Sequence, residues 1–235
     1  MNRLSLALAG LFGLALGVAG VLWWQGGRAP TTRAGVETVV RDYLLAHPEV
    51  IPEAMARLQQ RETGRALAAV SDRVTQPFAG AWAGNPDGDV TVVEYYDYNC
   101  GYCRASLPAI RQLIAADPNV RVVFRELPIL APTSRDAARA SLAAARQGRF
   151  AAFHDALYGG GRVTPESIAA AARNAGVDLS RADTAAADAE IARNLDDAGR
   201  LGLTGTPSWV IGDQLLSGAI PLDQLRRAVA DARAG

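Results

Sequence analysis

Cys100 and Cys103 are the only cysteines in this 235-residue chain, and their C-x-x-C spacing suits a metal site, a small disulfide or redox chemistry. A structural zinc site needs four nitrogen or sulfur ligands. Beyond the cysteines, the sequence offers only the histidines His47 and His154. A c-type haem would need a histidine directly after the second cysteine, where the chain has Arg104. We therefore expect neither a metal nor another bound cofactor.

A purely structural disulfide is a weak interpretation, because the loop it closes contains two intervening residues and would restrict the unfolded chain little. Redox chemistry fits better. The segment 90-VTVVEYYDY-98 predicts a buried strand, and it leads directly into the helical pattern 100-CGYCRASLPAIRQLIAA-116. Cys100 then lies at a helix N-terminus, where free main-chain N–H groups and the helix dipole stabilise a thiolate. We expect Cys100 to be the exposed nucleophile and Cys103 the shielded resolving thiol.

The elements that must position this pair indicate an α/β domain over residues 78–235. The segment 120-VRVVFREL-127 is a second strand, so residues 90–127 form a βαβ unit. Residues 133–198 are alanine-rich and predict several helices. Residues 206–220 predict two short strands around a Gly-Asp turn, followed by a helix that begins at Pro221. The predicted order is βαβ, a helical insert, and ββα.

Three motifs carry a resemblance to a known family: VVEYYDYNCGYC, FRELPIL and GTPSWVIG. Together they resemble DsbA-type thiol-disulfide oxidoreductases with a thioredoxin fold, over about residues 78–235. The resemblance implies a Cys100–Cys103 redox pair. It also implies a cis peptide at Thr206-Pro207 that faces the cysteines and presents a main-chain edge to a polypeptide substrate. The helical insert is typical of the same family.

Glu94 stands six positions before the first cysteine, in the predicted strand. The resemblance implies a buried acid that relays a proton to or from Cys103, with a pKa raised by desolvation. The alternative is a strand-edge glutamate in solvent, which the apolar neighbours disfavour. His154 lies in 150-FAAFHDALY-158 and is expected to be a packing residue of the insert rather than a catalytic one.

The residues around the pair point to a narrower class. Gly101 and Tyr102 between the cysteines, and Thr206 before the proline, resemble the isomerases DsbC and DsbG rather than the oxidase DsbA. We expect the Thr206 hydroxyl beside the cysteine sulfurs, where its hydrogen bond would favour the thiolate. The expected activity is disulfide isomerisation or reduction. The alternatives are a DsbA-like oxidase and, from another class, a non-enzymatic copper-binding or chaperone-like protein.

Residues 36–74 predict two helices, with Pro48 and Pro52 at the opening of the second. The stretch VRDYLLAHPEVIPEAMARLQ resembles the N-terminal region of ScsC-type proteins, several of which are trimeric. The alternatives are packing on the chain's own domain and self-association, and we expect the latter. The predicted seam is a thin apolar stripe formed by Ile51, Met55, Leu58, Leu67 and Val70.

Residues 1–27 predict a cleaved signal peptide or an uncleaved membrane anchor, because Arg3 precedes an uncharged apolar run over residues 4–24. Both alternatives imply the periplasm, where cysteines can cycle. The expected partners are cysteine-containing secreted proteins and a membrane thiol-disulfide redox partner. The 24 basic and 24 acidic residues leave no net charge, so nucleic acid is not an expected partner.

Overall fold

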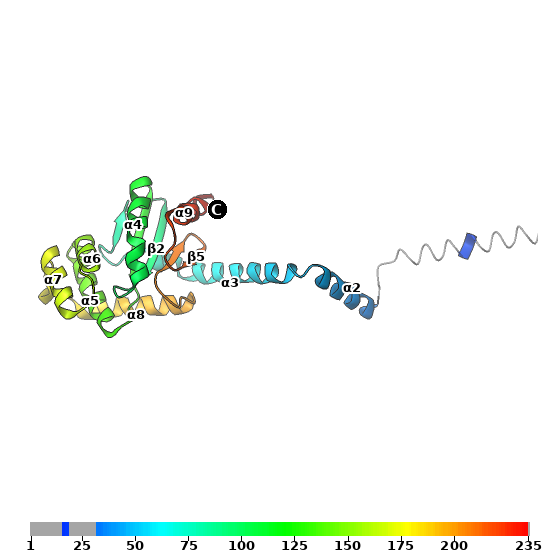
Figure 1. Ribbon diagram of the computed structural model, residues 1–235, viewed down its shortest axis with the longest axis horizontal. Coiled ribbons are helices and arrows are strands. Elements are labelled where there is room, and N and C mark those ends of the chain that lie inside the picture. Colours follow the sequence, from blue (N-terminus) through cyan, green and yellow to red (C-terminus); the bar gives the residue numbers. More distant parts are fainter. Residues whose placement is uncertain (1–15, 19–31, 235) are drawn as a thin grey trace, which may run out of the picture. The chain divides into compact units, whose positions relative to one another are not determined.

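The computed structural model describes residues 16–18 and 32–234 (Figure 1). The chain divides into two compact units, Met1–Leu58 and Gln59–Gly235. Apart from residues 16–18, the predicted signal or anchor at residues 1–27 lies outside the described residues. Within the described ranges, no helix is both long enough and apolar enough to cross a membrane.

The second unit contains a five-stranded sheet with the strand order β1-β3-β2-β4-β5. The central strands β2 and β3 are parallel, as a βαβ unit requires, and the other pairs are antiparallel. The strands are β1 (Trp82–Gly84), β2 (Val90–Tyr96), β3 (Val120–Glu126), β4 (Ser208–Ile211) and β5 (Gln214–Ser217). The predicted α/β thioredoxin fold is thereby confirmed. Only β1 was not expected, because three residues with a single large apolar side chain carry no strand pattern.

The helices of the second unit follow the predicted order. Between the βαβ and ββα parts lies the insert, two of whose helices begin at side chains that cap them. Thr164 and Asp183 accept hydrogen bonds from main-chain N–H groups of the first turns of α7 and α8. Figure 1 shows α5 to α7 gathered at the end of the domain opposite α9. The helices are α4 (Gly101–Ala116), α5 (Pro132–Arg146), α6 (Phe150–Gly159), α7 (Pro165–Ala175), the 3-10 turn Leu179–Arg181, α8 (Thr184–Arg200) and α9 (Leu222–Ala234).

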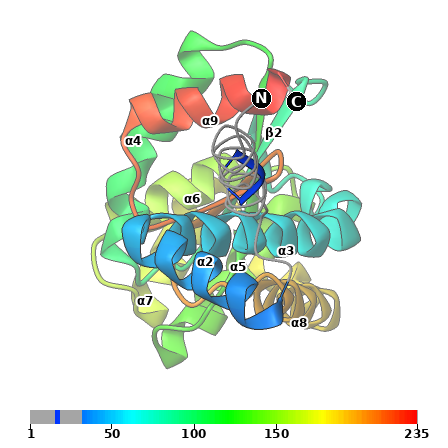
Figure 2. The same cartoon turned by 90° about the vertical axis from the view of Figure 1, so that its right-hand side faces the viewer.

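The alternation of side chains along β2 divides the core between the two faces of the sheet. Val92 and Tyr96 pack in a cluster with residues of α4, α9 and the insert helices α5 to α7. Val93 and Tyr95 face the other way and pack with residues of α3 and α8. In Figure 2, α9 and α8 accordingly lie on opposite sides of the domain. Glu94 shares the face of Val92 and Tyr96, toward the helix that carries the cysteines.

The apolar stripe of helix α3 (Val50–Thr75) predicts a self-association seam along the helix, but only the first part of the stripe is exposed. Leu67 and Val70 are 3% and 4% exposed, and with Val74 they belong to the core cluster under the sheet. The seam prediction is therefore wrong for Leu67 and Val70. Their spacing fits a helix face, but the partner of that face is the chain's own sheet.

Arg125, a buried residue of β3, holds the C-terminal end of α3 in place. Its guanidinium donates to the main-chain oxygens of Arg73, Val74 and Gln76, which the end of a helix leaves without partners. The charge is balanced by Glu190 of α8, with Nη1 and Oε1 2.6 Å apart. Both partners are only 4% exposed, so this is a buried ion pair that links α8 to the sheet, and Arg125 also bonds to the end of α3.

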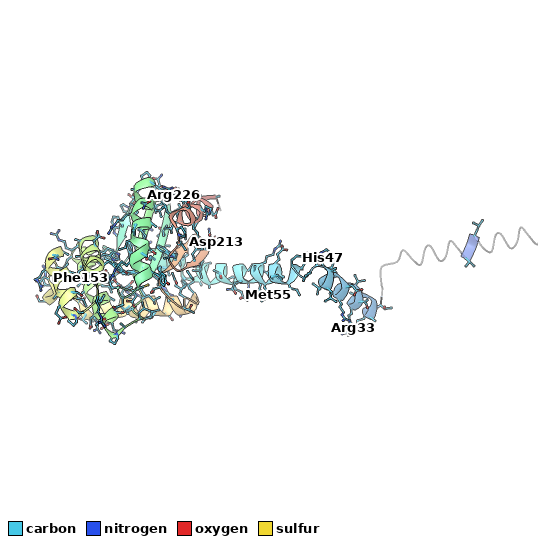
Figure 3. The ribbon with its side chains drawn as sticks, in the orientation of Figure 1. Arg33, His47, Met55, Phe153, Asp213 and Arg226 are labelled. Carbon is cyan, nitrogen blue, oxygen red and sulfur yellow. The ribbon has the colours of Figure 1, made fainter. Side chains whose placement is uncertain are left out.

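The first unit contains α2 (Arg33–Ala46) and the beginning of α3. Thr32 caps α2 by accepting a hydrogen bond from the Gly35 main-chain N–H. No residue of α2 is buried. The large apolar side chains of α2 and of the first part of α3 that stand exposed are Val36, Val39, Val40, Tyr43, Leu45, Ile51, Met55 and Leu58, of which Met55 is labelled in Figure 3.

We expect Leu67→Ala to lower the free energy of unfolding by about 2–5 kcal/mol, because it leaves a cavity under the sheet. Glu62→Ala, at an exposed position of the same helix outside the apolar stripe, should change it by less than about 0.5 kcal/mol. Urea unfolding of both variants measures the difference. Equal effects would mean that α3 does not pack on the domain at Leu67.

Candidate active site

Cys100 is the N-cap of α4, as its position at the strand-to-helix junction predicts. The chain leaves β2 at Tyr96 and turns over residues 97–99, and Cys100, with an extended φ of −82° and ψ of 115°, is the last residue before the helix. The Cys103 main-chain N–H donates to the Cys100 sulfur over 3.3 Å. This is one of the N–H groups that a helix leaves unpaired in its first turn. The sulfur is therefore held where the helix stabilises negative charge.

The second contact of Cys100 comes from the loop before β4. Its thiol donates to the main-chain oxygen of Thr206 over 3.1 Å, and the Thr206-Pro207 peptide is cis, as the resemblance implies. The hydrogen bond expected between the Thr206 hydroxyl and a cysteine sulfur is not formed, since this buried hydroxyl has no hydrogen-bond partner among the described residues. Cys100 is also only 5% exposed, less than expected of an exposed nucleophile.

Cys103 and Glu94 lie beneath this arrangement, and both are buried. Cys103 is fully buried and Glu94 is 1% exposed. Burial raises the pKa of the Cys103 thiol strongly, and the Glu94 carboxyl raises it further, while a main-chain hydrogen bond with Asp97 acts in the opposite direction. Burial, and after it the charge of Cys100, raises the pKa of Glu94 well above its ordinary value. The solvent-exposed alternative for Glu94 is thus excluded, and each group favours its protonated form.

The two residues between the cysteines face outward. Tyr102 is 70% exposed, and a side chain added at Gly101 would meet open space. Ile129 and Leu130, in the loop that follows β3, are 43% and 51% exposed. The sequence motif FRELPIL marks this loop, but nothing in its composition predicts that its apolar side chains remain uncovered.

Sequence reasoning missed a buried polar network between the sheet and the insert. The Tyr96 hydroxyl donates to Glu126, and the Tyr98 hydroxyl donates to Ser141 over 2.9 Å. The Tyr98 hydroxyl also lies 3.0 Å from Nδ1 of His154, and the rings of Tyr96 and His154 contact each other edge to face. The signal that could have found it is the run of tyrosines in strand β2, since a buried tyrosine hydroxyl needs a partner.

The electrostatics of this network follow from its burial. Desolvation raises the pKa of Glu126 from 4.5 to about 8, although hydrogen bonds from Tyr96 and Ser141 lower it. Desolvation also lowers the pKa of His154 from 6.5 to about 3. Both groups are therefore neutral near pH 7. This supports the expectation of a packing role for His154, because a neutral ring surrounded by aromatic side chains suits a core.

Comparisons with known proteins place this geometry in a family. A model described as a DSBA-like thioredoxin domain matches residues 91–230. The chain belongs to the DsbA-like thioredoxin family. A second model, described as the copper resistance protein ScsC N-terminal domain, matches residues 33–63. The combination confirms the resemblance to ScsC-type proteins.

Solved structures of DsbA-like proteins agree. A thioredoxin-like oxidoreductase from Silicibacter pomeroyi is 44% identical, with a TM-score of 0.64 over 68% of this chain and 95% of that one. A periplasmic thioredoxin-like protein from Salmonella enterica serovar Typhimurium is 30% identical, with a TM-score of 0.66 over 71% and 97%. A linker-deleted ScsC variant from Proteus mirabilis is 29% identical, with a TM-score of 0.69 over 88% and 99%.

The curated relatives are longer proteins. The one from Salinispora arenicola is named as a Na(+)/H(+) antiporter NhaA 1 and is 33% identical over 193 residues. That match covers 77% of this DsbA-like chain, which spans about 30% of the antiporter's length.

The raised pKa of Glu126 should make the DsbA-like domain less stable as the pH rises from about 6.5 to about 8. Between the unfolded value of 4.5 and the folded value of about 8, the folded state holds a proton that the unfolded state has lost, so folding weakens with rising pH. Below 6.5 the depressed pKa of His154 acts in the opposite direction, so the effect is clearest above that pH.

Urea unfolding at about pH 6.5 and about pH 8 tests this. The glutamine in Glu126→Gln cannot ionise and still accepts from Tyr96. As the pH rises, the free energy of unfolding of this variant should therefore decrease more slowly than that of the parent protein, by up to about 1.4 kcal/mol per pH unit. Glu94, whose pKa is also raised, keeps a residual slope in the variant. Parallel curves for the variant and the parent protein would contradict the burial of a protonated Glu126.

Proposed function

We propose that this protein is a periplasmic thiol-disulfide oxidoreductase that acts on polypeptide substrates through Cys100 and Cys103. The observation that carries the proposal is the arrangement of the pair: one sulfur caps a helix and meets the Thr206 carbonyl, and the other is buried with Glu94. Family membership supports the class of reaction, and the likeness to a periplasmic protein from Salmonella supports the compartment. Secreted proteins that contain cysteines are the proposed substrates.

The chemistry begins with the Cys100 thiolate, which attacks one sulfur of a substrate disulfide. A mixed disulfide forms, and the other substrate sulfur leaves as a thiolate. Cys103 then attacks the Cys100 sulfur, and the protonated Glu94 carboxyl relays the proton that the Cys103 thiol loses, giving up its own proton as it takes that one. The second substrate sulfur leaves and takes up a proton, so the substrate disulfide is reduced and the protein's pair is oxidised by two electrons. When a substrate thiol resolves the mixed disulfide instead, the substrate is isomerised without net oxidation.

Isomerase or reductase activity is the finer proposal, with DsbA-like oxidation as the alternative. Gly101-Tyr102 between the cysteines and Thr206 before the cis-proline support it by their resemblance to DsbC and DsbG. An isomerase needs its pair reduced, so it also needs a membrane redox partner that delivers electrons. A copper-binding function is the other alternative. It is supported by the match of residues 33–63 to the N-terminal domain of the copper resistance protein ScsC. It would have to use the two cysteine sulfurs, because the described residues hold no group of three or more histidine, cysteine or acidic side chains suited to a metal.

Self-association through the first unit completes the proposal, with a trimer as the proposed assembly. Val36, Val40 and Tyr43 on α2, and Ile51, Met55 and Leu58 on α3, are exposed apolar side chains on two successive helices. Such side chains stabilise a helix when another helix covers them. The match to the ScsC N-terminal domain covers all six of them. Joined domains raise the concentration of active sites around one bound polypeptide.

A protein that lacks residues 33–58, and keeps residues 1–32 so that it still reaches the periplasm, tests the assembly and the isomerase function together. It keeps Leu67, Val70 and Val74, so its domain should stay folded, but it loses the exposed apolar stripe. Light scattering should show a monomer, against an oligomer for the full chain. Thiol alkylation in cells should find Cys100 and Cys103 mostly reduced in the full chain and mostly oxidised in the truncated protein, because a monomer is accessible to an oxidising membrane partner.

Two outcomes would contradict these proposals separately. If light scattering shows that the full chain is a monomer, the proposed assembly is wrong. If the cysteines of the full chain are mostly oxidised in cells, the isomerase proposal is wrong and the oxidase alternative is favoured. A Cys103→Ala protein is the control, because it cannot form the intramolecular disulfide and should give the reduced pattern for Cys100 in either form.

A further inference from the structure

The Asp97 carboxylate joins two parts of the domain that the reaction needs and that the sequence keeps apart. It lies three residues before Cys100 and is 1% exposed. Its Oδ1 accepts from the Asn99 main-chain N–H over 2.8 Å and from the Ser134 hydroxyl over 2.8 Å. Its Oδ2 accepts from the main-chain N–H groups of Ile129 and Leu130, over 2.9 and 3.0 Å. The buried Asp97 carboxylate thus accepts four hydrogen bonds, two on each oxygen.

The main chain of Asp97 is engaged at the same place. Its carbonyl oxygen accepts from the Cys100 N–H over 2.9 Å and from the Tyr158 hydroxyl over 3.1 Å. The Cys100 turn is therefore built on Asp97 by two bonds, one through the carbonyl oxygen and one through Oδ1 to Asn99. Oδ2 contributes nothing to this turn. It serves only the loop after β3.

The loop held by Oδ2 has an unusual combination of properties. Its main chain is fixed, since the Leu127 N–H also donates to the Tyr96 carbonyl over 2.8 Å. Its side chains at Ile129 and Leu130 nevertheless stand 43% and 51% exposed. A loop that is fixed for its own stability would bury such side chains. A fixed main chain with exposed apolar side chains is suited to meeting another polypeptide.

We propose that Asp97 is a positioning residue that fixes the Ile129–Leu130 loop to the Cys100 turn, so that a polypeptide contacts this loop while its disulfide meets the Cys100 sulfur. This inference deepens the proposed function and rests on it. A small disulfide needs only Cys100. A polypeptide gains from the loop only when the loop and the sulfur keep a constant separation, because the contact must form together with the attack.

The roles of the two carboxylate oxygens of Asp97 can be distinguished by substitution. In Asp97→Ser the hydroxyl can still accept from the Asn99 N–H, because serine forms the same type of turn with the residue two positions on. Its side chain is too short to serve the Ile129 and Leu130 N–H groups as well. This variant therefore keeps the Cys100 turn and releases the loop.

Asp97→Asn is the matched variant with the opposite selectivity. The Ile129 and Leu130 N–H groups can only donate, whereas the Ser134 hydroxyl can turn to accept from an amide N–H. The amide oxygen should therefore face the loop and the amide nitrogen should face Ser134. This variant keeps the loop in place and weakens the bond to Asn99. Asp213→Asn, on the exposed turn between β4 and β5 (Figure 3), is the control for charge alone.

The experiment compares rates of reaction of the full chain with oxidised glutathione and with insulin. For Asp97→Ser we expect the insulin rate to fall about tenfold and the glutathione rate to change by less than about twofold. For Asp97→Asn the ratio of the two rates should stay within about twofold of the parent value, as it should for Asp213→Asn. Damage to the fold alone would lower both rates together, so the ratio separates positioning from structure.

An unchanged ratio in a folded Asp97→Ser protein would overturn the inference, as would a larger loss of the ratio in Asp97→Asn. Amide hydrogen exchange supplies a second test that needs no variant and no activity. The Ile129 and Leu130 N–H groups should be protected in the parent protein, and exchange at the rate of a free peptide would also overturn the inference. A parent protein that reacts with neither disulfide would instead refute the proposed function, while protected amides would leave the tether itself standing.

Discussion

The N–H groups at the start of α4 are the constraint on which the rest of the site depends. A sulfur can be held there only if the helix that follows the buried strand begins directly after Cys100, whose own φ and ψ are extended. The helix then presents the Cys103 N–H to the Cys100 sulfur and places Cys103 one turn deeper in the core. The different surroundings of the two cysteines, and hence the direction of their chemistry, come from this one junction.

The same junction forces polar groups into the core, and the domain handles them in two ways. The Asp97 carboxylate accepts hydrogen bonds from four donors, and Glu126 is hydrogen-bonded to Tyr96 and Ser141. Glu94 Oε1 and the Thr206 hydroxyl have no partner within the described residues. Leaving a buried polar atom unpaired costs about 1–3 kcal/mol. The hydroxyl of Tyr95, Nε2 of His154 and Oδ2 of Asp197 are likewise unpaired within the described residues, so unpaired groups are not confined to the site. Of the five, only those of Glu94 and Thr206 belong to residues that interact with the two cysteines.

How far the sequence could predict this structure depends on how local each feature is. The strand and helix around Cys100, the burial of Glu94 and the order of elements follow from periodicity and from motifs, and the structure bears them out. The partner of α3 did not follow, because Leu67 and Val70 form the same stripe whether a second copy or the chain's own sheet covers it. The contacts of Asp97 beyond Asn99, and those of Arg125, could not be foreseen either, since these partners lie 32 to 69 positions away in the sequence.

The reactivity of the two thiols toward iodoacetamide tests most directly the claim that one junction makes them unequal. With the reduced protein, each cysteine is followed by mass spectrometry of its own peptide as the pH is varied. We expect Cys100 to be labelled first, and Cys103 to stay unlabelled in the folded protein because burial and Glu94 raise the pKa of its thiol. Equal labelling of the two cysteines, or faster labelling of Cys103, would contradict the assignment of nucleophile and resolving thiol.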